Sequence, residues 1–157
     1  SANLACRLTG QGTWNDQQAW VSGLTIGGIG GWRLPSVDVN GDDTIISCFV
    51  VGIAGCSDNE MGFLFREEGI TAASPGVFTN VQPNDYWSVT EFAIPFSAWN
   101  FNFNNGNRFV DGMNFNFFAW AVHSGDVGAQ VPEPGTLALM GLGLMGLLGF
   151  GRQQRRR

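Results

Sequence analysis

The C-terminal tail constrains this chain more than any other stretch. Its first part is a short motif made of Val131, Pro132, Glu133 and Pro134. Residues 135–151 follow as a span without any charged side chain, and at about 1.5 Å per residue a helix of this length reaches about 25 Å. That is near the lower limit for crossing a bilayer core of about 30 Å. We therefore expect a transmembrane helix over 135–151.

A basic cluster closes the tail. It consists of Arg152, Arg155, Arg156 and Arg157. Arginine is costly in hydrocarbon and is retained on the cytoplasmic side, so residues 152–157 are expected to stop transfer and to leave the body of the chain outside. The alternative is a buried C-terminal helix of a globular domain. The span argues against it because it is apolar on every face and rich in glycine, which few helices of globular domains tolerate.

The three parts of the tail, in this order, resemble the PEP-CTERM sorting signal of Gram-negative bacteria. The resemblance implies export, transient anchoring in the inner membrane and recognition of the motif by an exosortase that removes the tail. It also implies a protein of the cell surface or extracellular matrix, in a context of exopolysaccharide and biofilm. Residues 129–134 are then a linker and sorting motif. A signal peptide, and part of the domain, are expected to precede Ser1.

The body, residues 1–128, is acidic. The whole chain carries eight basic and thirteen acidic residues, for a formal charge of −5. The tail holds four of the basic residues and one acid, so the body alone has a formal charge of −8, and it contains no lysine. Such a surface repels phosphate backbones, and nucleic acid is therefore excluded as an expected partner.

Three cysteines in an exported chain suggest one disulfide and one leftover thiol. Cys48 and Cys56 bracket a short loop, and closing it would stabilise the fold by about 2–3 kcal/mol. We predict this pair. The alternative, that both are small buried residues, stays open at this point.

Two helices are predicted in the first half of the body. Thr13 and Asp16 form a capping box at the start of one helix, which Gly27–Gly31 should end. A second capping box, Ser57–Glu60, predicts a helix that ends near Gly69.

The pattern of the second half of the body predicts antiparallel strands. Tyr86–Phe92 alternates, and so does Trp99–Phe103, which precedes an Asn105-Gly106 turn with a return strand at 107–110. Phe115–Val122 predicts a further strand. Seven asparagines lie between Asn100 and Asn116, and we expect them on the solvent face of a half-buried hairpin; the alternative is a ladder of amides that faces a glycan. We also expect four tryptophans to be buried together: Trp32, Trp87, Trp99 and Trp120.

Helices followed by strands predict an α+β fold with N-terminal helices on a small antiparallel sheet. Segments within 13–128 resemble the Lcl C-terminal-like domain of secreted bacterial proteins: Trp14–Asp16, Ala19–Trp20, Gly31–Pro35, Asn59–Met61, Tyr86–Ser88, Thr90–Phe92, Ala98–Trp99 and Ala119–Val122. This resemblance implies a C-type-lectin-like fold and an adhesin-like association with glycans. The acidic body departs from members that bind sulfated glycans, because it offers no basic patch for sulfate.

One acidic turn partly matches the pattern of a calcium-binding loop. Asp38, Asn40 and Asp42 place oxygens at positions 1, 3 and 5 of a calcium loop. Glycine falls at position 4 instead of 6, and Phe49 stands where a bidentate glutamate belongs at position 12. We expect a plain acidic turn and no cofactor, and these three residues are the ligands if a metal binds.

No pattern of catalytic residues stands out. His123 is the only histidine, so any base is that residue or a carboxylate, and Glu67-Glu68 diverge at a helix end. We expect a non-enzymatic structural or carbohydrate-associated module, with exosortase, the inner membrane and exopolysaccharide as partners. The alternative is an extracellular enzyme that acts on polysaccharide.

Overall fold

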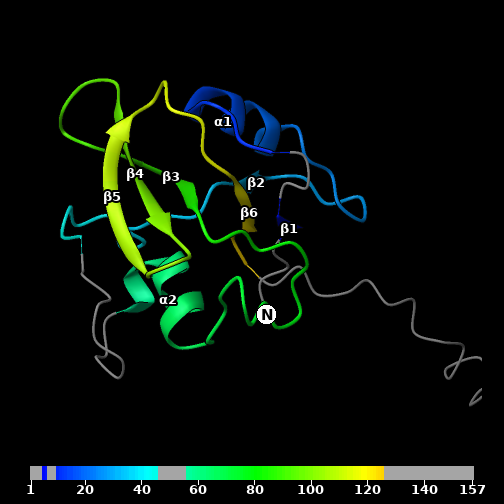
Figure 1. Ribbon diagram of the computed structural model, residues 1–157. Helices are drawn as coiled ribbons and strands as arrows, with labels where there is room; N and C mark the ends of the chain where they lie inside the picture. Colours follow the sequence, from blue (N-terminus) through cyan, green and yellow to red (C-terminus); the bar gives the residue numbers. More distant parts are fainter. Residues whose placement is uncertain (1–4, 7–9, 46–55, 126–157) are drawn as a thin grey trace, which may run out of the picture. The chain divides into compact units, whose positions relative to one another are not determined.

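The structure is a computed structural model that describes residues 5–6, 10–45 and 56–125 (Figure 1). Its elements are β1 (Ala5–Cys6), α1 (Trp14–Ser22), β2 (Trp32–Arg33), the 3₁₀ turn η1 (Cys56–Asp58), α2 (Glu60–Arg66), β3 (Asp85–Glu91), β4 (Ser97–Asn102), β5 (Asn107–Gly112) and β6 (Trp120–His123). This mixture of helices and small antiparallel sheets confirms the α+β class. The predicted helix over 135–151 lies outside the described residues. Within them, no helix combines the length and apolarity that a membrane crossing needs.

Helix α1 begins where the capping box predicts. The hydroxyl of Thr13 accepts from the backbone N–H of Asp16, and the Asp16 carboxylate accepts from the backbone N–H of Thr13 at 3.1 Å. Its end differs from the prediction. The helix stops at Ser22, because Gly23 already caps it, and Gly27 and Gly28 form a separate turn with positive φ.

Helix α2 begins two residues later than its capping box predicts. Ser57 and Asp58 belong to η1, and the cap is Asn59, whose side-chain oxygen accepts from the Gly62 N–H at 2.9 Å. The predicted pairing of Ser57 with Glu60 is therefore wrong. The Glu60 carboxylate pairs with Arg33 instead.

The described strands form two three-stranded antiparallel sheets. The order β3-β4-β5 contains the predicted hairpin, in which Asn102 faces Asn107 across the turn. The order β1-β6-β2 joins distant segments, with Ala5 opposite Ala121. The predicted strand Phe115–Val122 is shorter than expected. Only Trp120–His123 forms β6, and Phe117 and Phe118 make isolated bridges instead.

Asn100 contradicts the expected solvent face of the hairpin. It is fully buried in β4, and its side-chain N–H donates to Asp111 on β5 at 2.8 Å. Trp99 is only partly buried and carries the Arg108 guanidinium on its ring. The alternation of aromatic and asparagine residues is real, but both faces of β4 are at least partly covered.

The apolar core consists of two clusters on opposite faces of β3. Tyr86 belongs to the cluster that contains Met61 and Leu64 of α2, whereas Trp87 belongs to the one that contains Trp14 and Val21 of α1. Successive strand residues point to opposite faces, so β3 lies between the helices (Figure 1). The four tryptophans are therefore not buried together. Trp32 and Trp87 share one cluster, Trp120 lies in the other, and Trp99 is at its edge.

Candidate functional site

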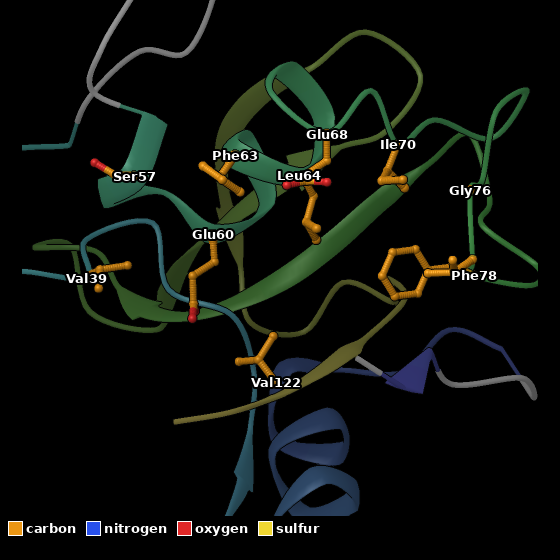
Figure 2. Close-up of a pocket in the computed structure, with 11 residues that line it drawn as sticks. Val39, Ser57, Glu60, Phe63, Leu64, Glu68, Ile70, Gly76, Phe78 and Val122 are labelled. Carbon is orange, nitrogen blue, oxygen red and sulfur yellow. The ribbon is translucent and has the colours of Figure 1, made fainter. Parts of the chain in front are cut away.

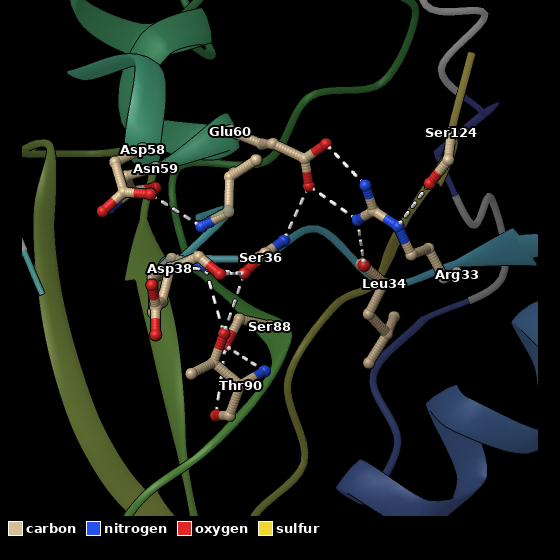
Figure 3. Close-up of polar contacts among 12 residues, drawn as sticks. Arg33, Leu34, Ser36, Asp38, Asp58, Asn59, Glu60, Ser88, Thr90 and Ser124 are labelled. Atoms are coloured by element: carbon tan, nitrogen blue, oxygen red, sulfur yellow. Dashed lines mark hydrogen bonds and ion pairs between the residues drawn. The ribbon is translucent and has the colours of Figure 1, made fainter. Parts of the chain in front are cut away.

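An ion pair joins β2 to the start of α2 (Figure 3). The guanidinium of Arg33 donates from Nη1 and Nη2 to the two carboxylate oxygens of Glu60 at 2.7 and 2.9 Å. Its Nε donates to the Ser124 hydroxyl at 3.1 Å. The side chains of Arg33 and Glu60 are 31% and 27% exposed, so the pair is shielded from solvent on most sides. Bidentate pairs of this kind fix geometry as well as charge.

The chain after β2 is then hydrogen-bonded along the segment that leads into α2. The N–H of Ser36 donates to Glu60 Oε2 at 2.7 Å, and the N–H of Glu60 donates back to the Ser36 carbonyl. Further along, the N–H groups of Val39 and Asn40 donate to Asp58 Oδ1 at 2.8 and 2.9 Å. Residues 36–40 and 58–60 are thus held side by side.

The acidic turn at 38–44 folds around Asp38. Its Oδ1 accepts from the N–H groups of Gly41 and Asp42, and its Oδ2 accepts from the N–H of Asp43. Asp42 in turn accepts from the Thr44 N–H at 2.8 Å. Gly41 and Asp43 have positive φ, which the tight curvature of the turn requires.

A third aspartate joins this turn from η1. One carboxylate oxygen from each of Asp38, Asp42 and Asp58 lies within 4.8 Å of the other two. Asp38 is half-buried and Asp42 is exposed, whereas Asp58 is only 6% exposed. Oδ2 of Asp58 is buried and has no hydrogen-bond partner among the described residues.

The structure therefore brings two of the three predicted metal ligands together and adds one. Asn40 acts differently from the prediction. Its Oδ1 accepts from the Asp42 N–H, and its Nδ2 donates to Asp42 Oδ2 at 3.2 Å, so it braces the turn. Asp58 was missed because the motif around it reads as a helix cap. Sequence spacing gives no signal that it folds back onto Asp42.

An apolar pocket of about 750 Å³ lies next to this turn (Figure 2). Its walls include the side chains of Val39, Phe63, Leu64, Ile70, Phe78 and Val122. Two carboxylates, Glu60 and Glu68, also line it. Glu60 is already engaged with Arg33, while Glu68 is exposed at the C-terminal end of α2. The pocket thus combines aromatic and aliphatic walls with one carboxylate open to solvent.

The histidine and two serines that could be considered as a base and as nucleophiles occupy separate places. His123 ends β6 and packs edge-on against Trp32, with ring centroids 5.5 Å apart. The Ser88 hydroxyl donates to the Trp99 carbonyl at 2.8 Å, and the Ser124 hydroxyl accepts from Arg33. Each of these side chains has a structural contact that accounts for its position.

Several predicted positions lie outside the described residues. They include the sorting motif Val131–Pro134, the arginines of 152–157 and Cys48. Cys56 is described and buried, and it forms no disulfide with another described residue. The disulfide between Cys48 and Cys56 therefore stays a prediction.

Comparison with known proteins concerns the tail alone. Residues 130–157 match the family model of the PEP-CTERM protein-sorting motif. No curated protein and no solved structure matches the chain, so the Lcl-like and C-type-lectin-like expectations gain no support from relatives. The motif indicates a protein that is exported, held in the membrane as a precursor and sorted by an exosortase to the cell surface.

Proposed function

We propose that the body, residues 1–128, is a non-enzymatic, adhesin-like module that associates with extracellular polysaccharide after exosortase sorting. The observation that carries this proposal is the sorting motif at 130–157. Sorting to the surface places the body among the polymers of the cell envelope. We further propose that the producing cell is a Gram-negative bacterium with its own exopolysaccharide.

The pocket supports an association with carbohydrate. Phe63 and Phe78 give it aromatic side chains, and such groups pack against the apolar face of a sugar ring. Glu68 is exposed at the same pocket and accepts hydrogen bonds from hydroxyl groups. A neutral or amino-bearing polymer fits this acidic body better than a sulfated one.

The alternative is an enzyme that cleaves polysaccharide, and one observation favours it. Glu60 and Glu68 line the same pocket, and glycoside hydrolysis uses two carboxylates. Glu60, however, accepts two hydrogen bonds from Arg33 and one from the Ser36 N–H. A carboxylate held in this way braces α2, which leaves Glu68 without a catalytic partner and favours binding.

The two functions are separated by measuring retention and cleavage on the same polymer. The protein is incubated with exopolysaccharide from the producing cells, and both its co-sedimentation and newly formed reducing ends are recorded. We expect retention without cleavage, and Glu68→Gln should weaken it about threefold or more through the loss of a charge-assisted hydrogen bond. Glu67→Gln is the matched control, because Glu67 is the exposed neighbour outside the pocket. Cleavage without retention would establish the enzyme instead.

A further inference from the structure

The geometry points to a Ca²⁺ site formed by the carboxylates of Asp38, Asp42 and Asp58, which ties the acidic turn to the start of α2. Oxygens from the three side chains lie within 4.8 Å of one another. Two of the carboxylates come from one turn, and the third comes from η1, on the other side of the chain segment 46–55.

Asp58 is the residue that distinguishes this cluster from an ordinary acidic turn. Its side chain is more than nine-tenths buried and faces two further carboxylates. Oδ1 is satisfied by two backbone N–H groups, whereas the buried Oδ2 has no hydrogen-bond partner in the part of the chain that is described. A buried carboxylate oxygen without a partner is costly, and other carboxylates cannot donate to it. A bound cation satisfies it directly.

Among the described residues, a positive side chain does not neutralise the three carboxylates, so an external cation would have to do so. Within the described residues, no arginine forms an ion pair with any of the three aspartates. The guanidinium of Arg33 is held instead by Glu60, close by in sequence to Asp58 but on the other side of Asn59. Three carboxylates gathered without a positive side chain attract a cation electrostatically.

The donor set selects the kind of cation. All three ligands are carboxylates, which suit Ca²⁺ or Mg²⁺, whereas Zn²⁺ favours histidine and cysteine. Asp42 is exposed and Asp38 half-buried, so water can complete an irregular shell of six to eight oxygens, which Ca²⁺ accepts. Mg²⁺ demands a near-ideal octahedron and holds its own water more firmly.

Asp58 also replaces the acidic ligand that the calcium-loop pattern in the sequence lacks. The calcium-loop pattern that starts at Asp38 lacks its final acidic ligand because Phe49 stands at position 12. Asp58 supplies a carboxylate from outside the loop. Few charged ligands and a partly open shell correspond to extracellular calcium modules, with a Kd of about 10⁻⁴–10⁻³ M.

The experiment uses the full chain, purified in detergent micelles, stripped with a chelator and titrated with CaCl₂ by calorimetry at constant ionic strength. MgCl₂ is titrated in parallel. We expect one saturable site for Ca²⁺ and at least about tenfold weaker binding of Mg²⁺. Asp58→Asn and Asp42→Asn should each weaken Ca²⁺ binding about tenfold or more, because each removes one charged ligand.

Asp43→Asn is the matched control. It removes one charge from the same turn, it lies outside the cluster, and asparagine tolerates the positive φ of this position. Ca²⁺ should bind to this variant with nearly wild-type affinity and raise its melting temperature, as it does for the wild type. If Asp58→Asn fails to fold, the exposed Asp42→Asn carries the test. A wild-type chain without saturable Ca²⁺ binding, or an equal loss in Asp43→Asn and Asp42→Asn, overturns the proposal.

Discussion

Arg33 and Glu60 meet in a bidentate ion pair that connects β2 with the first turn of α2. The carboxylate lies at the helix N-terminus, where the helix dipole also favours negative charge. The same carboxylate accepts the Ser36 N–H, so one side chain fixes both the strand and the chain that leaves it. The acidic turn comes directly after this junction in the chain, and its residue Val39 lines the pocket.

We predict that Glu60→Gln lowers the free energy of unfolding by about 1.5–3 kcal/mol, because it weakens charge-assisted hydrogen bonds in a partly buried place. Urea denaturation followed by tryptophan fluorescence measures the change. Glu67→Gln, an exposed change at the other end of α2, should shift stability by no more than about 0.5 kcal/mol. Equal effects of the two substitutions would show that the pair with Arg33 contributes nothing specific.

Two glycines with the same backbone requirement give a second prediction. Gly106 and Gly27 both have positive φ, so alanine costs about 1–2 kcal/mol at either position. A Cβ on Gly106 would also meet the ring of Phe65 at 2.5 Å, whereas a Cβ on Gly27 meets nothing within 4 Å. We expect Gly106→Ala to destabilise by a further 1–3 kcal/mol or so, as overpacking does. Thermal melts of the two variants should therefore differ, and coinciding melts would exclude the clash.

The tryptophans give a third prediction. Trp87→Ala should lower the free energy of unfolding by about 3–5 kcal/mol, because the side chain is fully buried on the face of β3 that packs with Trp14 and Val21 of α1. Trp99→Ala should cost less, since that ring is partly exposed and packs mainly against Phe92 and Arg108. Chemical denaturation of both variants tests the order. A larger loss for Trp99→Ala would contradict the difference in burial between the two rings.

Local patterns predicted much of the fold. The Thr13 capping box and the Asn105-Gly106 turn each involve residues a few positions apart, so their physics is visible in the sequence. The burial of Asn100 was not predictable in this way. It depends on Asp111 lying across the hairpin and on cover over a face that alternation assigns to solvent.

The candidate site likewise contains residues that local sequence predicts and one that only the tertiary structure places. Asp38 and Asp42 are recognisable because they share one turn, whereas Asp58 joins them only through the tertiary structure. Its approach depends on Arg33 and Glu60, which hold residues 36–40 beside 58–60. The ion pair links two segments that are far apart in sequence, and no periodicity in the chain indicates their contact.

We predict that Cys48 and Cys56 are joined in the exported protein, because an oxidising compartment favours the pairing of cysteines that bracket a short loop. Cys56 begins η1, two residues before Asp58, so the bond would anchor the segment that carries this aspartate. Mass spectrometry of peptides from non-reduced protein provides the measurement. Both thiols free, or Cys6 joined to either, would contradict the prediction.

The last prediction concerns the order of events at the tail. Pro132 and Pro134 each restrict the preceding residue to extended conformations, so the motif should present an extended backbone to the exosortase. Arg152 and Arg155–Arg157 should prevent the apolar span from passing through the membrane. In a host with an exosortase, the wild-type chain should therefore lose about 25 residues from its C-terminus.

Two variants separate these roles. Replacing Pro132, Glu133 and Pro134 with alanine should leave an uncut protein in the inner-membrane fraction, because the span and its basic stop remain intact. Replacing the four arginines with glutamine should instead let the chain slip outward and reduce processing, because the stop is lost while the motif remains. Intact mass measurement of protein from surface and inner-membrane fractions distinguishes these outcomes. A mature surface protein that still ends in Arg157 would falsify the processing role of the tail.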